Sequence, residues 1–586
     1  MLTRLSLRGS VRSIIRCSSA SLTPGYSQAP VQHGFTKAFI ARSNRSYCQS
    51  SPRFNSPDIK ITSEELFRYT EGRWLVGDDL NQELRYVKFD VHELCRRAAE
   101  DVGDGTKVIR VDKIPSLNSR VLLLTMDDGK EIIAKIKCPI TGPVMMTTIS
   151  EVTILAFLDG MTSIRGPEVY GLECDEEKLG AEYILMEKMK GVPLTQKWGS
   201  MSSLDQMKII DQVVEMEKEL ANLKFPAYGS LATPVLSEVD FRTYPLSSSL
   251  DPDRHCAIGP CFDSDWWYTR NQDGTQAKIV DSGPWLTLAE YGHAITQREL
   301  ALIENESTAP EIQRRLESFD KSQSLAEYKD LLKKVQSVIP ILSRDQRVLD
   351  IAEPILRNDM LGLEDIYVSL EDPTKIEGFI GWRTSKVLPL FVQASLPNFV
   401  PLPAFYTYGA HTYSRPDDFD TLSPETKQSV IKELDMASRA KYYELKRCQE
   451  IKKMNNPYEV NRKLWRLFEV CAMQGSGSIT PLRNRLHQLF ENWSALGLPG
   501  ACPFSVTEAE VQRQRQQEDK LIASLDVEDI VRDKLSTNSV GWIASDQWEE
   551  KLKANQELHE DFVQTVSKDI DAESATQMWP FPPNSK

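Results

Sequence analysis

Residues 121–137 read VLLLTMDDGKEIIAKIK, two runs rich in Val, Ile and Leu on either side of an Asp-Asp-Gly turn. An Asp-Gly connection between such runs is a strong signal for a β-hairpin. A further apolar run at 107–111 precedes the hairpin, a helical pattern follows at 148–158, and another strand pattern follows at 181–186. This order predicts a small antiparallel sheet with one helix packed on it.

The rest of the chain is mainly helical. Five apolar residues step by three or four along one predicted helix face: Ile210, Val213, Met216, Leu220 and Leu223. We therefore predict an α+β, bilobal, kinase-like fold. Its parts are an N-terminal extension at 48–104, a sheet lobe at 105–190, a helical lobe at 191–505 with an aromatic insertion near 258–290, and a charged, solvated helical tail at 506–586.

Charge is unevenly distributed along the 586 residues, which carry 70 Lys plus Arg and 84 Asp plus Glu for a net charge of −14. Residues 1–57 hold eight basic residues and no acidic one, so the remaining chain carries −14 − 8 = −22. An Arg-rich, Ser-rich, acid-free N-terminus is typical of a mitochondrial transit peptide, which we predict at 1–47, with the matrix as the default compartment. The acidic remainder argues against a nucleic-acid binder.

Membrane and metal signals are weak. The longest charge-free run, 387–414, contains four prolines, which break helices, so we predict no transmembrane segment. The ten cysteines include no CxxC pair, and the spacing of His255, Cys256 and Cys261 fits no standard zinc pattern. We predict no metal site.

Lys135 and Glu151 are the first candidate functional residues. Lys135 lies on the second hairpin strand, and Glu151 lies early in the following predicted helix. In kinases a strand lysine contacts the nucleotide phosphates and is held by a glutamate from this helix. A lysine and a glutamate at this spacing can equally form a structural ion pair of small energetic weight.

Several motifs resemble a known family. They read LLLTMDDGKE at 122–131, CP at 138–139, TTISEV at 147–152, GAEYILMEK at 180–188, GVPL at 191–194, IGP at 258–260, GPW at 283–285, PLF at 389–391, FENW at 490–493 and CPF at 502–504. Together they closely resemble the fungal phosphotransferase-like family that is related to aminoglycoside phosphotransferases and includes altered inheritance of mitochondria protein nine. The resemblance spans about 60–510 and implies a protein-kinase-like fold with an adenine pocket beneath Met186, Glu187 and Met189.

The catalytic motifs depart from the family pattern of His-x-Asp-x4-Asn followed by a metal-binding Asp. The matching segment at 354–368 reads PILRNDMLGLEDIYV. Aligned from both flanks, Asn358 stands at the His position, Met360 at the catalytic Asp position and Asp365 at the metal-binding Asn position. Gly381 stands where the family has its second metal-binding Asp.

These replacements remove chemistry. A thioether cannot accept a proton near neutral pH and is a poor ligand for Mg²⁺, and glycine has no side chain. The predicted phosphate-covering turn also lacks glycine, because none occurs between Gly105 and Gly129. Each loss could remove a few kcal/mol of transition-state stabilisation, roughly a hundredfold or more in rate.

One alternative alignment keeps an acid in place. Shifted by one residue, Asp359 becomes the base and Asp365 a metal ligand, but this requires a bulge and leaves Gly381 unexplained. The sequence therefore favours a mitochondrial pseudoenzyme for nucleotide binding or scaffolding, with Lys135, Glu151, Glu187 and Met189 as candidate ATP-binding residues and Mg²⁺ in doubt. The alternatives are an active ATP-dependent phosphotransferase acting on a small-molecule or protein hydroxyl, and an interaction protein that binds an unknown partner through its tail.

Overall fold

The computed structural model describes residues 58–59 and 63–583, apart from 104, 143–144, 235–240, 264–265, 268, 271–275, 278–280, 307, 359, 404, 410, 473–477 and 568–571. The predicted transit peptide at 1–47 and the fallback base Asp359 lie outside the described residues.

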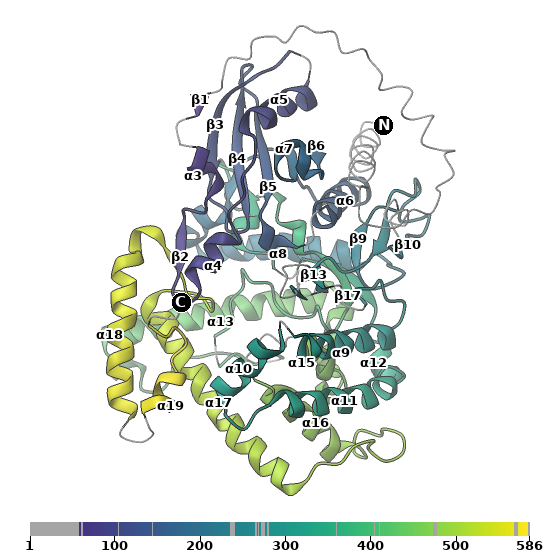
Figure 1. Cartoon of the computed structure of the whole chain (residues 1–586), viewed down its shortest axis with the longest axis vertical. Coiled ribbons are helices and arrows are strands. Elements are labelled where there is room, and N and C mark those ends of the chain that lie inside the picture. Colours follow the sequence, from purple (N-terminus) through teal and green to yellow (C-terminus); the bar gives the residue numbers. More distant parts are fainter. Residues whose placement is uncertain are drawn as a thin grey trace.

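The small lobe is built on a six-stranded sheet with the order β1-β3-β4-β5-β7-β6 (Figure 1). The predicted hairpin forms its centre, with Leu122 opposite Ala134 across β4 and β5. All neighbours are antiparallel except β1 and β3. The strands are β1 (Asp58–Ile59), β3 (Val108–Ile114), β4 (Ser119–Met126), β5 (Glu131–Lys137), β6 (Val169–Glu173) and β7 (Tyr183–Glu187).

Helices cover both faces of this sheet. On one face, Leu94 and Ala98 of α5 (Val91–Val102) share a core with Leu122 and Leu124. On the other, α6 (Met146–Met161) packs through a second cluster that joins Ile149 to β7. Since α5 lies within the predicted extension at 48–104, the packing of the small lobe begins before residue 105. The lobe also contains α3 (Ser63–Phe67), α4 (Asp78–Glu83), α7 (Glu176–Leu179) and β2 (Gly72–Trp74).

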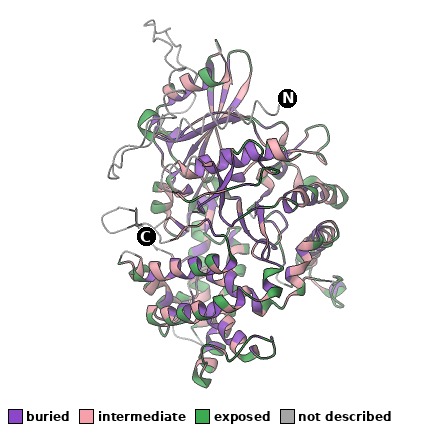
Figure 2. Ribbon diagram, turned by 90° about the vertical axis from the view of Figure 1, so that its right-hand side faces the viewer, coloured by how far each residue is buried: buried purple, intermediate pink, exposed green. Residues whose placement is uncertain are grey.

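Helix α6 is largely enclosed within the protein. Every residue from 147 to 158 is buried, including Glu151. Figure 2 shows buried residues running through the middle of both lobes and exposed residues on the outer faces of the helices. A carboxylate in this position must be paired, because an isolated buried charge is strongly unfavourable.

The large lobe is mainly helical. Four of the five residues predicted on one apolar face, Ile210, Val213, Met216 and Leu220, are buried on its first long helix, α8, whereas Leu223 follows the end of that helix and is half-buried. Its helices are α8 (Ser203–Ala221), α9 (Leu288–Glu304), α10 (Ala309–Phe319), α11 (Leu325–Leu342), α12 (Gln346–Leu349), α13 (Pro424–Glu450), α14 (Asn456–Glu459), α15 (Arg466–Ala472) and α16 (Thr480–Asn492). Its short strands are β8 (Val192–Pro193), β9 (Ser230–Ala232), β10 (Tyr244–Pro245), β11 (Ala257–Gly259), β12 (Thr269–Arg270), β13 (Gln276–Ala277), β14 (Pro354–Arg357), β15 (Ile366–Val368), β16 (Ile376–Phe379) and β17 (Lys386–Pro389). Together the two lobes confirm the bilobal α+β expectation.

The C-terminal tail is packed against the body of the protein, which corrects the expectation of a solvated tail. It comprises α17 (Glu508–Leu535), β18 (Trp542–Ala544), α18 (Trp548–Val566) and α19 (Ala572–Gln577). Helix α17 lies against α16 of the large lobe, and β18 then pairs with β2, placing Trp542 opposite Trp74 (Figure 1). The tail therefore connects the large lobe to the N-terminal segment of the small lobe.

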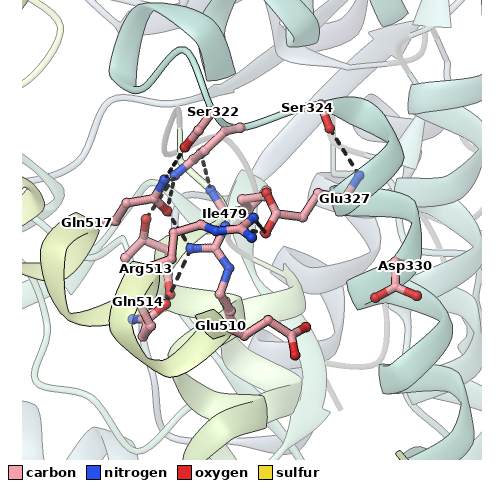
Figure 3. A network of polar contacts seen from close by, with 12 residues as sticks. Ser322, Ser324, Glu327, Asp330, Ile479, Glu510, Arg513, Gln514 and Gln517 are labelled. Atoms are coloured by element: carbon pink, nitrogen blue, oxygen red, sulfur yellow. Dashed lines mark hydrogen bonds and ion pairs between the residues drawn. The ribbon is translucent and has the colours of Figure 1, made fainter. Parts of the chain in front are cut away.

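Buried polar contacts attach α17 to the large lobe (Figure 3). Arg483 of α16 donates from Nη2 to Glu327 Oε1 at 2.7 Å and also donates to Gln517 Oε1. Gln517 is 3% exposed, and its Nε2 donates to Ser322 Oγ at 2.9 Å. The charge-rich and Gln-rich sequence does not indicate this contact. Gln514 and Gln517 are buried in it, but polar residues usually indicate an exposed helix face.

Within the described residues, no helix combines the length and apolar character needed to cross a bilayer.

Candidate functional site

Two lysines of β5 point at the carboxylate of α6. Lys135 Nζ lies 2.5 Å from Glu151 Oε1, and Lys137 Nζ contacts Glu151 Oε2. The exposed fractions of the three side chains are 16% for Lys135, 1% for Lys137 and 4% for Glu151. The sequence analysis singled out Lys135 and Glu151 but missed Lys137. Strand alternation could have found it, because residues two apart on a strand share a face.

The environment of this triad changes its acidities. Burial lowers the pKa of Lys135 to about 8, although Glu151 acts in the opposite direction. Burial alone would raise the pKa of Glu151, but Lys135 and Lys137 together hold it well below its usual range. With two ammonium groups on one carboxylate, the triad carries a formal charge of +1 facing the space between the lobes. Such a charge favours an anionic ligand.

The carboxylate of Asp365 occupies the space beside Gly381. A Cβ added to Gly381 would lie 2.3 Å from Asp365 Oδ1, and Gly381 has φ +79°. Asp365 is fixed at both ends: its Oδ2 accepts from Gly362 N at 3.1 Å, and its carbonyl accepts from Ile380 N at 2.8 Å. The two positions at which the family pattern places metal ligands are therefore in contact, but only one of them has an oxygen-bearing side chain.

Asp365 also titrates unusually. Burial raises its pKa to about 6, even though the Gly362 amide, Lys135 and Arg383 favour the ionised form. The carboxylate is thus less readily charged than an exposed aspartate. The sequence analysis did not single out Arg383, which lies two residues after Gly381 and near enough to lower the pKa of Lys135 as well.

The remaining motif positions lie beside this contact. Asn358 is 4% exposed, and its Nδ2 donates to the Gly381 carbonyl at 3.4 Å. Its Oδ1 has no hydrogen-bond partner in the described part of the chain. Met360 is 55% exposed, and its Sδ is 3.7 Å from Asn398 Nδ2. The structure therefore brings positions 358, 365 and 381 together, as the resemblance implies. Met360, which the resemblance aligns with the catalytic aspartate, carries an exposed thioether.

The segment after β7 corresponds to the predicted adenine contact. The Glu187 side chain is directed to Arg165, whose Nη2 lies 3.0 Å from Glu187 Oε1. Met189 is 4% exposed and packs against Gly378 of β16, where a Cβ would lie 2.3 Å from Met189 Cε. Within the described part of the chain, the backbone amide and carbonyl of Met189 have no hydrogen-bond partner. They could serve a base through main-chain contacts, whereas the Glu187 side chain is already committed elsewhere.

The turn over the site, between β3 and β4, is held by a side chain that the sequence analysis did not identify. Arg85 donates from Nε to the Leu117 carbonyl at 3.0 Å, and its guanidinium lies 4.3 Å from the centre of the Trp74 ring. The turn is therefore anchored to the N-terminal part of the small lobe. This arrangement differs from a mobile glycine-rich loop, in which free backbone amides approach phosphates.

The residues present do not fit the magnesium site of the family pattern. Among the described residues, no group of three His, Cys, Asp or Glu side chains could hold a metal ion. At the site itself, Asp365 is the one motif position with a carboxylate, and Gly381 supplies no ligand. Mg²⁺ is bound by carboxylates together with substrate phosphates, and its octahedral geometry is strict. We therefore derive no chemical step through a metal.

Comparison with known proteins supports the sequence resemblance. No protein-family model matches the chain. A subtelomeric hrmA-associated cluster protein of Aspergillus fumigatus is 25% identical over 490 residues, covering 79% of this chain and 94% of that protein. The mitochondrial protein named altered inheritance of mitochondria protein 9 from Candida dubliniensis is 22% identical over 461 residues, covering 66% of this chain and 70% of that protein. The expected family resemblance is confirmed.

Solved structures with similarity to the chain include aminoglycoside phosphotransferases. The ternary complex of streptomycin, ATP and APH(2'')-IIa has a TM-score of 0.32 and 10% identity, covering 68% of this chain and 96% of that one. An ADP-bound aminoglycoside phosphotransferase, APH(2'')-Ib, has a TM-score of 0.31 and 10% identity, covering 67% of this chain and 96% of that one.

Proposed function

We propose that this protein is a mitochondrial pseudo-phosphotransferase, a kinase-like fold that binds a nucleotide without transferring its phosphate. The observation that carries the proposal is the contact between Asp365 and Gly381. Because the Asp365 carboxylate fills the space of the missing side chain, a second metal ligand cannot be placed there without moving it. A second supporting observation is the exposed Met360, because its thioether cannot accept a proton as the family's catalytic aspartate does.

Nucleotide binding is supported by the groups that remain. Lys135 is held by Glu151 as a phosphate-binding lysine would be, and the main chain of Met189 is free to meet a base. The formal charge of +1 on the lysine–glutamate triad replaces part of the charge that a metal ion would supply. A mitochondrial location is supported by the predicted transit peptide and by relatives that carry a mitochondrial name.

Thermal unfolding of the full chain with ATP, with and without Mg²⁺, tests this proposal. A ligand present at 100 times its Kd and bound only to the folded state adds about 2.7 kcal/mol to the free energy of unfolding. We expect a rise in Tm that does not need Mg²⁺ and is lost in Lys135→Met. A rise that occurs only with Mg²⁺ would contradict the proposal, as would ATP consumption that scales with enzyme concentration.

An active phosphotransferase is the second candidate, and the retained carboxylate of Asp365 favours it. In that case Asp365 would be the metal ligand and Asp359 the base. Single variants Asp365→Asn and Asp359→Asn would each abolish ATP turnover. If the wild-type protein shows no turnover above that of these variants, this candidate fails.

The third candidate, an interaction protein acting through its tail, is favoured by exposed apolar side chains on α17. Ile522, Leu525 and Ile530 are 53%, 49% and 56% exposed although the helix is docked. Exchanging all three for Gln should then abolish co-purification of a partner without lowering Tm. Unchanged co-purification would count against this candidate.

A further inference from the structure

A polar cavity lies between the lobes, and Ser150, the residue before Glu151, lines it, whereas the three residues of the lysine–glutamate triad do not. Its volume is about 240 Å³. The small lobe contributes Asn118, Thr147 and Ser150, and the large lobe contributes Ser230, Arg383 and Ser385 among others. Lys135 is not among the residues that line it. A site for drug-sized ligands usually has about 300–1,000 Å³, so this cavity suits a smaller molecule.

The charge of the cavity is positive. Its charged lining residues are Arg383, Lys386 and Asp263, and Lys386 Nζ lies 2.5 Å from Asp263 Oδ2. Arg383 is the charged lining residue outside that ion pair, although its guanidinium also lies near enough to Asp365 to favour the ionised form of that carboxylate. Within the described residues no ion pair involves Arg383. A planar guanidinium presents several N–H groups in a fork that matches carboxylate and phosphate oxygens.

Hydroxyl groups of the large lobe complete the lining. Ser385 is 3% exposed, and its Oγ has no hydrogen-bond partner among the residues that the structure describes. Ser230 Oγ accepts from Phe262 N at 3.1 Å, and its own proton has no acceptor in the part of the chain that the structure describes. A buried hydroxyl without a partner is less stable than a satisfied one, so a ligand that accepts its proton would gain affinity from this contact.

We propose that this cavity binds a phosphate group, either free or carried by a small phosphorylated metabolite. Arg383 supplies the charge, and the hydroxyls of Ser385 and Ser230 donate hydrogen bonds to phosphate oxygens. Phosphate fits better than a carboxylate because three or four acceptor oxygens can meet donors that come from several sides of the cavity. The proposal does not require nucleotide binding at Lys135, since that residue belongs to the neighbouring triad.

Isothermal titration of the full-length protein tests the proposal. The probes are inorganic phosphate and glycerol 3-phosphate, in a chloride buffer of constant ionic strength. We expect Arg383→Gln to weaken binding of both probes at least tenfold and Ser385→Ala to weaken it three- to tenfold. Lys135→Met and the exposed-surface variant Lys208→Gln should bind as the wild type does. Tighter binding of glycerol 3-phosphate than of phosphate identifies a metabolite as the ligand, and equal binding identifies free phosphate.

The proposal is overturned if neither probe binds at millimolar concentration, or if Arg383→Gln and Ser385→Ala bind normally. It is also overturned if Lys135→Met abolishes binding while Ser385→Ala does not, because the phosphate would then occupy the nucleotide site. The serine variant should fold normally, since it removes a hydroxyl that has no partner. Its Tm without ligand checks this, and its Tm shift with ATP separates a failure here from a failure of the proposed nucleotide binding.

Discussion

Asp365 Oδ1 lies 2.3 Å from the position that a Cβ on Gly381 would occupy. The two departures from the family pattern at these positions are therefore one structural arrangement. The family pattern has Asn at the first position and Asp at the second, whereas here the carboxylate stands at the first and the second has no side chain. The site still has space for one carboxylate, but here that carboxylate comes from the segment before β15 rather than from the segment after β16.

Gly381→Ala should destabilise the protein through this contact. The substitution places a methyl group against a fixed carboxylate and forces Ala into the left-handed region, so we expect a loss of about 2–4 kcal/mol. Gly129→Ala is the matched control, because Gly129 has φ +85° and nothing within 4 Å of an added Cβ. Urea unfolding of both variants and of the wild type measures the two losses in the free energy of unfolding. Equal losses would show that the backbone conformation alone is responsible and that the carboxylate moves freely.

Restoring the family's acids should require a change at position 365. The double variant Met360→Asp with Gly381→Asp is expected to lose stability and gain no Mg²⁺-dependent ATP binding, because the new carboxylate meets Asp365. Adding Asp365→Asn, the family residue, lowers the charge repulsion between the side chains. This triple variant should show a Mg²⁺-dependent rise in Tm with ATP. A gain in the double variant as large as that in the triple variant would contradict the role given to charge repulsion between positions 365 and 381.

The pKa of Asp365, about 6, predicts a pH dependence of stability. Since the unfolded chain titrates near pH 4, the folded state binds more protons between about pH 4 and pH 6, and the free energy of unfolding falls as pH rises through that window. The expected loss is on the order of 1–3 kcal/mol. In Asp365→Asn this fall should disappear, so the free energy of unfolding of the variant should increase relative to that of the wild type as pH rises.

Urea unfolding at pH 4.5, 5.5, 6.5 and 7.5, followed by tryptophan fluorescence, measures this difference. Dilute protein is needed because the isoelectric point is about 5.3. Asp519→Asn on the exposed face of α17 is the control and should follow the wild type at each pH. A constant offset between Asp365→Asn and the wild type would mean that Asp365 is already ionised at the lowest pH.

The side chains of the lysine–glutamate triad should contribute unequally to the stability of the protein. Glu151→Gln leaves two buried lysines without a carboxylate, and we expect a loss of about 3–5 kcal/mol. Lys135→Met leaves Glu151 paired with Lys137, so its loss should be about 1–2 kcal/mol. Glu131→Gln breaks the exposed pair with Lys188 and should cost at most about 1 kcal/mol. Denaturant unfolding ranks the three variants. A Glu151→Gln loss no larger than that of Lys135→Met would argue against shared pairing.

Gln517 should matter for docking of the tail. Gln517→Ala removes the acceptor for Arg483 and Gln323, and we expect a loss of about 1–3 kcal/mol. Gln516→Ala changes the exposed neighbour and should be nearly neutral. Limited proteolysis between residues 505 and 545 gives a second measurement. We expect faster cleavage in Gln517→Ala but not in Gln516→Ala. Similar cleavage rates in both would indicate that the network does not hold α17.

The sequence by itself determined the local elements and the order in which they occur. Apolar alternation and the Asp-Asp-Gly turn predicted β4 and β5 because both signals act over neighbouring residues. The motif at 354–368 located the positions of Asn358, Met360 and Asp365 in the same way. The resemblance then placed Gly381 opposite them, and the structure brings these positions together.

Contacts between distant segments were decided only by the tertiary structure. Lys137 joins Lys135 on Glu151 because α6 crosses the β5 face that carries both lysines, and Arg383 approaches the cavity because the large lobe closes beneath the small one. The docking of α17 through Gln517 is another such case, since a polar side chain gives no sign of burial in the sequence. Each of these contacts depends on which surfaces meet after folding, and residue type and spacing along the chain do not encode that directly.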